Sequence, residues 1–148
     1  MTLFKNYNDK NLHELTVLED TIEIGHINLG NPHGIFFTSD IYNLPLDSWG
    51  NALQTSSWFP DGVNFGLAHV LSPSKVNLRV YERGVGETLS CGSGACATVI
   101  LGVRLGLLEE EVEVNFKKGS LFVKYKEVSR KLTARGTANF LKEIKISI

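Results

Sequence analysis

Hydrophobic and polar residues alternate along much of this 148-residue chain, and a period of two residues is typical of β-strands with one buried face. The alternation is clearest in Val112–Phe116 and Leu121–Tyr125, which flank the polar turn Lys117–Ser120. It recurs in Leu67–Leu71 and Val76–Tyr81, which are joined by a short segment that contains a proline. Each pair of segments predicts a β-hairpin.

Shorter segments with the same pattern lie on both sides of these hairpins. The further predicted strands are Leu15–Val17, Thr21–Asn28, Ile35–Phe37, Leu132–Ala134 and Ala138–Leu141, and an alternating tail, Ile144–Ile148, follows them. Residues 1–13 are polar and predict a lead-in without regular structure. Residues 44–57 carry Trp49 and Leu53 on one helical face, which predicts a short packing helix.

The stretch Ser90–Gly106 departs from this alternation. Its first residues are small and predict a loop, whereas Ala95–Leu105 is a mostly apolar run that predicts about three turns of helix, ended by Gly106. Apart from Arg104 the helix is uncharged and apolar on every side, so other elements must surround it. Many strands and one long buried helix predict an α+β domain whose sheet curls around that helix.

Size and composition limit the classes of protein that fit. A chain of 148 residues with 43% hydrophobic residues predicts one domain, residues 1–148, whose core needs no metal or disulfide. The net charge is −1, and the scattered Lys and Arg residues argue against a nucleic-acid partner. The sequence has no apolar segment of signal-peptide or membrane-spanning length, which predicts a soluble, cytoplasmic protein without a membrane partner.

Residues that bind metals or form disulfides are sparse. Cys91 and Cys96 have a spacing that matches neither a redox pair nor a zinc site, and two cysteines predict no disulfide framework. The four histidines have no zinc-like spacing to one another or to the cysteines. We therefore expect no metal site.

Cys91 lies just before the predicted helix, where unpaired N–H groups carry about half a positive charge. A thiol in that position has a lowered pKa and can act as a base or a nucleophile. We expect this of Cys91 and not of Cys96, which lies inside the helix. The alternative is that Cys91 is only a small buried residue. The preceding residues 81–89 favour chemistry, because they gather two carboxylates and a guanidinium beside the thiol.

A polar turn, Gly30–Gly34, precedes the strand Ile35–Phe37 and places Asn31 and His33 at a strand end. The residues alone leave two interpretations open for each side chain. Asn31 is either a ligand-binding residue or an ordinary turn residue, and His33 is either catalytic or structural.

Three motifs, in this order, resemble diaminopimelate epimerase. They are Gly30-Asn31-Pro32-His33, Phe59-Pro60-Asp61-Gly62-Val63-Asn64 and Tyr81 to Ala97, and the similarity extends from about Leu15 to the end of the chain. Members of this family have two similar domains, each with a mixed, barrel-like sheet around one central helix. The resemblance implies that this chain corresponds to the second, C-terminal domain and lacks the first.

The resemblance also implies cofactor-independent chemistry with two cysteines, one from each domain, on opposite faces of the substrate α-carbon. One thiolate removes the α-proton and the other thiol returns one, because a single base tends to return its proton to the same face. Cys91 matches the second-domain cysteine, and His33 and Glu82 are implied to tune the thiols. The implied substrate-binding residues are Asn31, Asn64, Glu82, Arg83, Gly92 and Ser93. For Arg83, a structural ion pair with Glu87 is the alternative.

We therefore expect an amino-acid epimerase domain of lysine and cell-wall precursor biosynthesis, with diaminopimelate as its small-molecule substrate. The alternatives are a catalytically silent fragment that binds a carboxylate or another anion, and a related racemase or isomerase of the proline racemase or phenazine-biosynthesis type. Cys96 cannot replace the missing cysteine, since it lies more than one helical turn beyond Cys91. We expect a homodimer or a separate chain to supply the first domain, and the apolar edge Ile144–Ile148 favours association.

Overall fold

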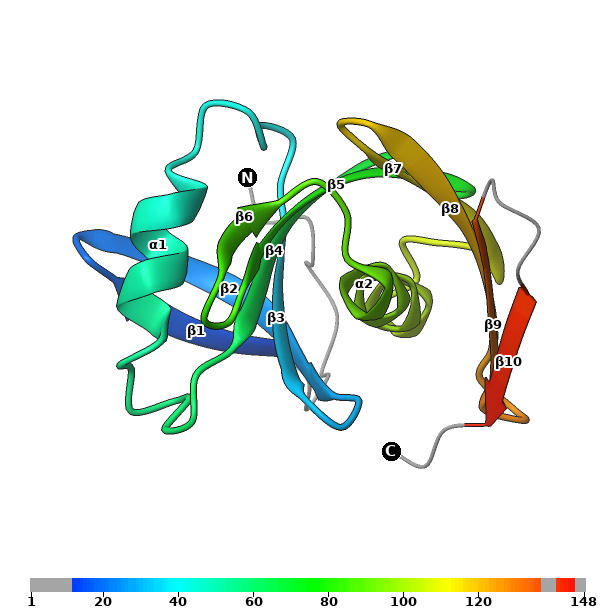
Figure 1. Ribbon diagram of the computed structural model, residues 1–148, viewed down its shortest axis with the longest axis horizontal. Helices are drawn as coiled ribbons and strands as arrows, with labels where there is room; N and C mark the ends of the chain where they lie inside the picture. Colours follow the sequence, from blue (N-terminus) through cyan, green and yellow to red (C-terminus); the bar gives the residue numbers. More distant parts are fainter. Residues whose placement is uncertain (1–11, 137–140, 146–148) are drawn as a thin grey trace.

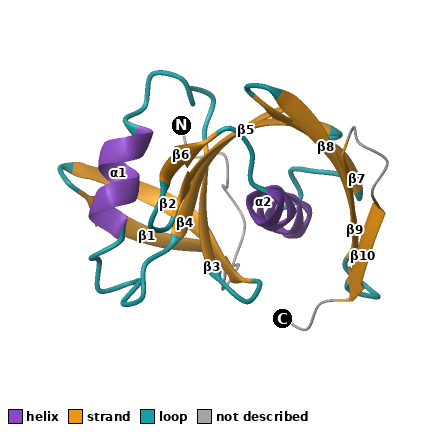
Figure 2. Cartoon of the chain, in the orientation of Figure 1, coloured by secondary structure: helices purple, strands orange, loops and turns teal. Residues whose placement is uncertain are grey.

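The computed structural model describes residues 12–136 and 141–145, which form ten strands and two helices (Figures 1 and 2). The strands are β1 (Leu12–Val17), β2 (Asp20–Asn28), β3 (Pro32–Phe37), β4 (Asn64–Ser72), β5 (Lys75–Glu82), β6 (Gly86–Thr88), β7 (Glu111–Phe116), β8 (Gly119–Lys126), β9 (Lys131–Gly136) and β10 (Leu141–Lys145). The helices are α1 (Leu46–Leu53) and α2 (Gly92–Arg104). Within these ranges no helix is long and apolar enough to span a membrane.

All the strands belong to one mixed sheet in the order β1-β2-β3-β4-β5-β7-β8-β9-β10, and β6 pairs with β5 off this path. Neighbouring strands are antiparallel except for the parallel pairs β3–β4 and β5–β7. A parallel pair needs a long crossover connection, and these two crossovers carry α1 and α2 respectively. The sheet curls without closing (Figure 1), which confirms the predicted α+β fold in an open form.

The helix α2 lies between two parts of this curled sheet, with β1–β6 on one side and β7–β10 on the other (Figure 1). Every residue from Gly94 to Gly102 is buried, and the helix contacts β2, β3, β4, β8 and β9. The packing is close, since a Cβ on Gly25 would lie 3.0 Å from Cδ1 of Leu101. Burial of a side chain such as Leu101 stabilises the fold by about 1.5–3 kcal/mol. The predicted buried central helix is therefore confirmed.

A second core lies on the opposite face of the sheet, where α1 packs. The buried side of α1 includes Trp49 and Leu53, as the sequence pattern predicts. The strand β4 serves both cores, because Phe65 faces the α1 side and Ala68 faces the α2 side. A strand buried on both faces loses the polar alternation of a half-exposed strand.

Some element boundaries differ from the sequence prediction. The strand β1 starts at Leu12, inside the polar segment predicted to be irregular, because its backbone pairs with β2 from Leu12 opposite Gly25 onward. The helix α1 ends at Leu53, so residues 54–57 are not helical. The pattern does not predict β6, whose three residues lack a hydrophobic alternation.

The C-terminal predictions are only partly covered by the structure. The strand β10 (Leu141–Lys145) pairs antiparallel with β9, so this part of the tail has a partner on one side. Residues 138–140 of the predicted strand Ala138–Leu141 and residues 146–148 of the alternating tail lie outside the described residues.

Candidate active site around Cys91

Cys91 is the N-cap residue of α2, with an extended backbone at φ −146° and ψ 107°. Its Sγ atom accepts the N–H of Gly94 at 3.3 Å and lies 3.5 Å from Oγ of Ser93. This bond satisfies one of the N–H groups that a helix start leaves unpaired. Because Cys91 caps the helix, α2 begins at Gly92, three residues before the predicted start at Ala95.

The pKa of the Cys91 thiol is raised above its ordinary value of 9.0, which is opposite to the lowering predicted from the helix terminus. Burial is the main cause, since only 5% of the residue is exposed, and the carboxylate of Glu82 raises the pKa further. The hydrogen bonds from Ser93 and Gly94 act in the other direction but do not outweigh burial. The prediction of a lowered pKa is therefore wrong for this domain.

Cys96 lies one turn into α2 and is also buried as a free thiol. Burial, followed by the effect of Cys91, raises the pKa of Cys96 to about 11. In contrast to Cys91, it gains no hydrogen bond that lowers the pKa. The predicted absence of an activated thiol at Cys96 is consistent with this environment.

His33 lies in β3 and is fully buried. Its Nε2 atom is 3.2 Å from Oδ1 of Asn31, whereas Nδ1 has no hydrogen-bond partner among the described residues. Burial lowers the pKa of His33 to about 4, although Glu82 acts to raise it. The imidazole is therefore neutral at pH 7, so it adds no positive charge near the thiol.

Glu82, the last residue of β5, connects these groups electrostatically. Its negative charge raises the pKa of Cys91 and also acts to raise the pKa of His33. Three titratable groups that are far apart in the sequence therefore share one environment. The structure brings together Cys91, His33 and Glu82, and the roles that the family resemblance implies for them stay predictions.

Asn64 starts β4 directly opposite His33 on the parallel strand β3. Its Oδ1 atom accepts the backbone N–H of Arg83 at 2.8 Å, and only 6% of the residue is exposed. Because the described residues provide no acceptor for Nδ2, this amide nitrogen is the group left for a ligand. A buried amide with a free donor can select an oxygen atom of a substrate.

The guanidinium of Arg83 donates from Nη1 to the carbonyl of Asp61 at 3.0 Å. The alternative of an Arg83–Glu87 ion pair is wrong, because Glu87 pairs with Arg79, at 2.8 Å between Nε and Oε1. Gly62 makes room for Arg83, since its φ is +84° and a Cβ there would lie 2.7 Å from Cδ of Arg83. A cavity of about 460 Å³ adjoins Arg83 at this point.

One further residue, Gln54, shapes this loop, and the sequence analysis does not identify it. The side-chain amide of Gln54 accepts the N–H of Val63 at 3.0 Å and donates to the carbonyl of Val63 at 2.8 Å. This pair of bonds fixes the backbone just before Asn64. Gln54 and Arg79 occupy polar positions of a predicted helix and a predicted strand, so only their contacts reveal what they bind.

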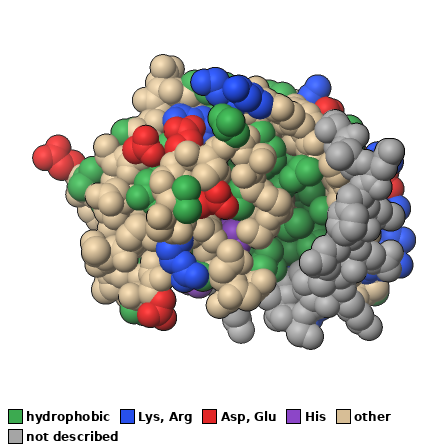
Figure 3. Space-filling model, viewed as in Figure 1, with side chains coloured by type: hydrophobic (Ala, Val, Ile, Leu, Met, Phe, Trp, Pro, Cys, Tyr) green, Lys and Arg blue, Asp and Glu red, His purple; other side chains and the backbone are tan. Residues whose placement is uncertain are grey.

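Gly92 and Ser93 form the first turn of α2. Gly92 is exposed, and a Cβ at this position would meet no atom within 4 Å. The backbone is thus accessible at the positively polarised end of the helix, an arrangement suited to binding an anion. On one face of the molecule, hydrophobic side chains gather between the two parts of the sheet beside α2 (Figure 3).

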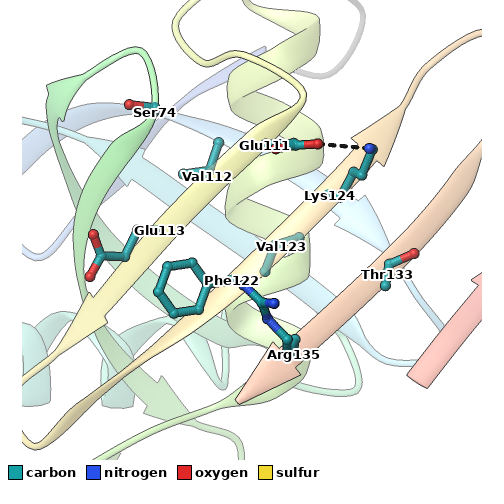
Figure 4. A pocket seen from close by; sticks show the side chains of 9 residues that line it. All are labelled: Ser74, Glu111, Val112, Glu113, Phe122, Val123, Lys124, Thr133 and Arg135. Atoms are coloured by element: carbon teal, nitrogen blue, oxygen red, sulfur yellow. Dashed lines mark ion pairs between the residues drawn. The ribbon is translucent and has the colours of Figure 1, made fainter. Parts of the chain in front are cut away.

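A different cavity, of about 490 Å³, lies on the outer face of β7, β8 and β9, and no residue of the Cys91 site lines it. Arg135 lies over the ring of Phe122 there, 5.0 Å from its centroid, and Glu111 pairs with Lys124 at 2.7 Å (Figure 4). These charged groups are already paired or stacked. The described residues contain no group of three or more His, Cys, Asp or Glu side chains that could hold a metal.

Comparisons with known proteins agree on the family and the fold. The family model for diaminopimelate epimerase matches residues 25–141. The diaminopimelate epimerase of Buchnera aphidicola is 42% identical over 90% of this chain and 47% of its own length, and that of Nitrosospira multiformis is 40% identical over 85% and 46%. The chain thus spans about half the length of these relatives.

Solved structures with a similar fold include phenazine biosynthesis proteins of the PhzF family. The protein from Bacillus anthracis has a TM-score of 0.56 at 22% identity, over 78% of this chain and 40% of that chain. The protein from Enterococcus faecalis has a TM-score of 0.53 at 19% identity, over 70% of this chain and 36% of that chain. On the family match and the similarity to these relatives, the chain belongs to the diaminopimelate epimerase family.

Proposed function

We propose that this chain is the half of a cytoplasmic amino-acid epimerase that supplies one acid–base thiol, Cys91, for proton transfer at the α-carbon of diaminopimelate. The observation that carries the proposal is the position of the thiol. Cys91 caps α2 beside the accessible backbone of Gly92, and Glu82 lies near enough to raise the pKa of the thiol. The reaction would serve lysine and cell-wall precursor biosynthesis.

The substrate carboxylate would bind at the start of α2. The backbone N–H groups of Gly92 and Ser93 would donate to it, and this stabilises the carbanion that forms when the adjacent C–H bond breaks. Asn31, Arg83 and the Nδ2 group of Asn64 would contact the remaining polar groups of the substrate, with Glu82 at the edge nearest the thiol. None of these steps requires a metal or a cofactor.

Proton transfer would use Cys91 as an acid in one direction and as a base in the other. As a base, the thiolate takes the α-proton, so an S–H bond forms while the electron pair of the C–H bond passes to the carbanion. As an acid, the thiol gives its proton to the carbanion and becomes a thiolate. Because burial and Glu82 raise the pKa of Cys91, the ligand-free site favours the protonated, acidic form.

Inversion also needs a group on the opposite face of the α-carbon. Cys96 is unsuited, since it is buried within α2. We propose that a second copy of this chain, or a separate chain, supplies that group. Sedimentation velocity of the purified chain, alone and at increasing concentration, tests the homodimer directly.

The activity test follows the α-proton of diaminopimelate in deuterated water by NMR, together with the stereochemistry of the recovered substrate. If a complete site assembles, we expect the wild-type chain to exchange the α-proton and to invert the substrate. Cys91→Ser should do neither. Exchange without inversion means that one base works alone. Binding without exchange would contradict the proposed catalysis and favour a silent carboxylate-binding domain.

A further inference from the structure

We propose that the ion pair between Arg79 and Glu87 positions the turn between β5 and β6, and so fixes the position of Glu82 relative to Cys91. Arg79 touches neither reacting group, so it and Glu87 are positioning residues. The inference deepens the proposed function and rests on it for the catalytic consequence. The positioning itself can be measured without a substrate.

The strand β6 is too short to hold this turn by itself. It has three residues, which pair with β5 at Val80–Thr88, Tyr81–Glu87 and Glu82–Gly86, and its other edge pairs with no strand among the described residues. It is thus a short edge strand of the sheet, and it also contacts α1. Three pairs of residues give it a small pairing area, so a further contact would hold it more firmly.

The Arg79–Glu87 ion pair supplies that contact with two parallel hydrogen bonds. Nε of Arg79 donates to Oε1 of Glu87 at 2.8 Å, and Nη2 donates to Oε2 at 3.0 Å. Their shared hydrogen bonds are the main cause of a raised pKa at Arg79 and a lowered pKa at Glu87, so both remain charged near neutral pH. The planar guanidinium fits a carboxylate in this way, whereas a lysine ammonium does not.

The same guanidinium also anchors the segment that leads into α1. Its Nη1 atom donates to the carbonyl oxygens of Ile41 and Leu44. Arg79 therefore joins β5, β6 and the loop before α1. Because these are three different segments, loss of the side chain would loosen the attachment of β6, which would then depend on its pairing with β5 and its contacts with α1.

The position of Glu87 in the chain explains why this matters for the site. In one direction the backbone runs through the turn to Arg83 and Glu82, and in the other it runs through Leu89 to Cys91. Leu89 is 54% exposed, so its side chain does little to hold the connection in place. Fixing Glu87 therefore limits the movement of Glu82 and Cys91 relative to each other.

The test compares wild type with Glu87→Gln, which keeps the size of the side chain and removes its charge. The rate of Cys91 alkylation by iodoacetamide is measured from pH 6.5 to 10, with each cysteine followed by mass spectrometry. We expect Glu87→Gln to move the Cys91 profile to lower pH and to raise the rate at pH 7.5 about threefold or more, because Glu82 no longer raises the thiol pKa. The buried Cys96 should change little.

The matched control is Glu111→Gln, which makes the same chemical change in the exposed Glu111–Lys124 pair (Figure 4). It should leave the Cys91 profile unchanged. Arg79→Lys is the second variant, and it should shift the profile in the same direction because an ammonium lacks the two parallel donors of the guanidinium. A wild-type Cys91 profile in both Glu87→Gln and Arg79→Lys would overturn the inference.

The proposed function can fail independently of this result. If the wild-type chain exchanges no α-proton, the proposed function is contradicted. The alkylation profiles still test whether the Arg79–Glu87 pair positions Glu82 relative to Cys91. If the wild-type chain exchanges the α-proton, we expect Glu87→Gln to lower the exchange rate at saturating substrate and to shift its pH dependence. An unchanged exchange profile would also overturn the inference.

Discussion

Asn64 accepts the backbone N–H of Arg83 through its Oδ1 atom at 2.8 Å, and this bond ties the start of β4 to the turn after β5. Both residues match positions that the family resemblance assigns to substrate binding. The bond gives Asn64 a structural role as well, and it leaves the Nδ2 group for a ligand. Under the proposed function, binding and stability are therefore coupled at this residue.

We predict that Asn64→Ala lowers the free energy of unfolding by about 1–3 kcal/mol, because the N–H of Arg83 loses its acceptor. Urea denaturation at pH 7 measures the loss. The control is Asn77→Ala, which deletes a half-buried amide that accepts a side-chain bond from Asn115 and leaves no backbone N–H unpaired. Equal losses in the two variants would show that the Asn64–Arg83 bond stabilises the fold no more than the Asn77–Asn115 bond.

The lowered pKa of the buried His33 predicts that the protein loses stability in mild acid. The pKa of His33 is about 4 in the folded protein and about 6.5 in an unfolded chain, so between these values only the unfolded state binds the proton. Stability is therefore full above pH 6.5 and falls as the pH drops toward 4, by about 3 kcal/mol from this residue.

Denaturant unfolding at pH 7 and pH 4.5 tests this prediction. Other groups also titrate in that range, so the comparison is between wild type and His33→Asn, which should lose less stability between the two pH values. His69→Asn, a half-buried histidine of β4, serves as the control and should follow wild type. If His33→Asn shows the same acid sensitivity as wild type, the buried neutral imidazole is not the cause.

The close packing of Gly62 against Arg83 predicts that a larger residue at position 62 destabilises the protein. Gly62→Ala should destabilise the protein by more than Gly106→Ala, because both glycines have a positive φ but only Gly62 has atoms within reach of an added Cβ. The positive φ alone costs about 1 kcal/mol in each variant. The difference between their melting temperatures measures the contact with Arg83 and Gln54. Equal melting temperatures would mean that the loop relaxes without strain.

The spacing of hydrophobic residues in the sequence predicts two kinds of element: those with one exposed face and those with no exposed face. The hairpin of β7 and β8 follows the alternation, since Val112 and Val114 are buried between more exposed neighbours. The apolar run from Ala95 onward predicts the buried helix because no surface helix tolerates apolar residues on every side. In both cases the burial is visible in the spacing of the residues themselves.

Other features depend on contacts between distant residues, which no local pattern contains. The strand β6 forms through pairing with β5 and through the bond between Arg79 and Glu87. The pKa of Cys91 also depends on distant residues. The helix terminus is evident from the sequence, whereas the burial that raises the pKa depends on the surrounding sheet. The site residues themselves are found in the sequence through their motifs, and their hydrogen bonds are found only in the fold.

Cys91→Ser separates the structural role of this residue from its proposed chemical role. Serine is a favoured N-cap residue and its hydroxyl can accept the N–H of Gly94, so the free energy of unfolding should change by less than about 1 kcal/mol. A hydroxyl is a far weaker acid than a thiol, so exchange of the substrate α-proton should fall below detection. Thermal unfolding and NMR exchange in deuterated water measure the two effects in the same sample.

Cys96→Ser is the matched control for this prediction. It makes the same atomic change one turn into α2, where the new hydroxyl is buried without a capping role and should cost about 1–3 kcal/mol. Its exchange rate at a temperature below the unfolding transition should nevertheless match wild type, because Cys96 does not face the start of the helix. The expected pattern is thus a stable, inactive Cys91→Ser and a less stable, active Cys96→Ser. The reverse pattern would assign the chemistry to Cys96 and exclude Cys91 as the acid–base group.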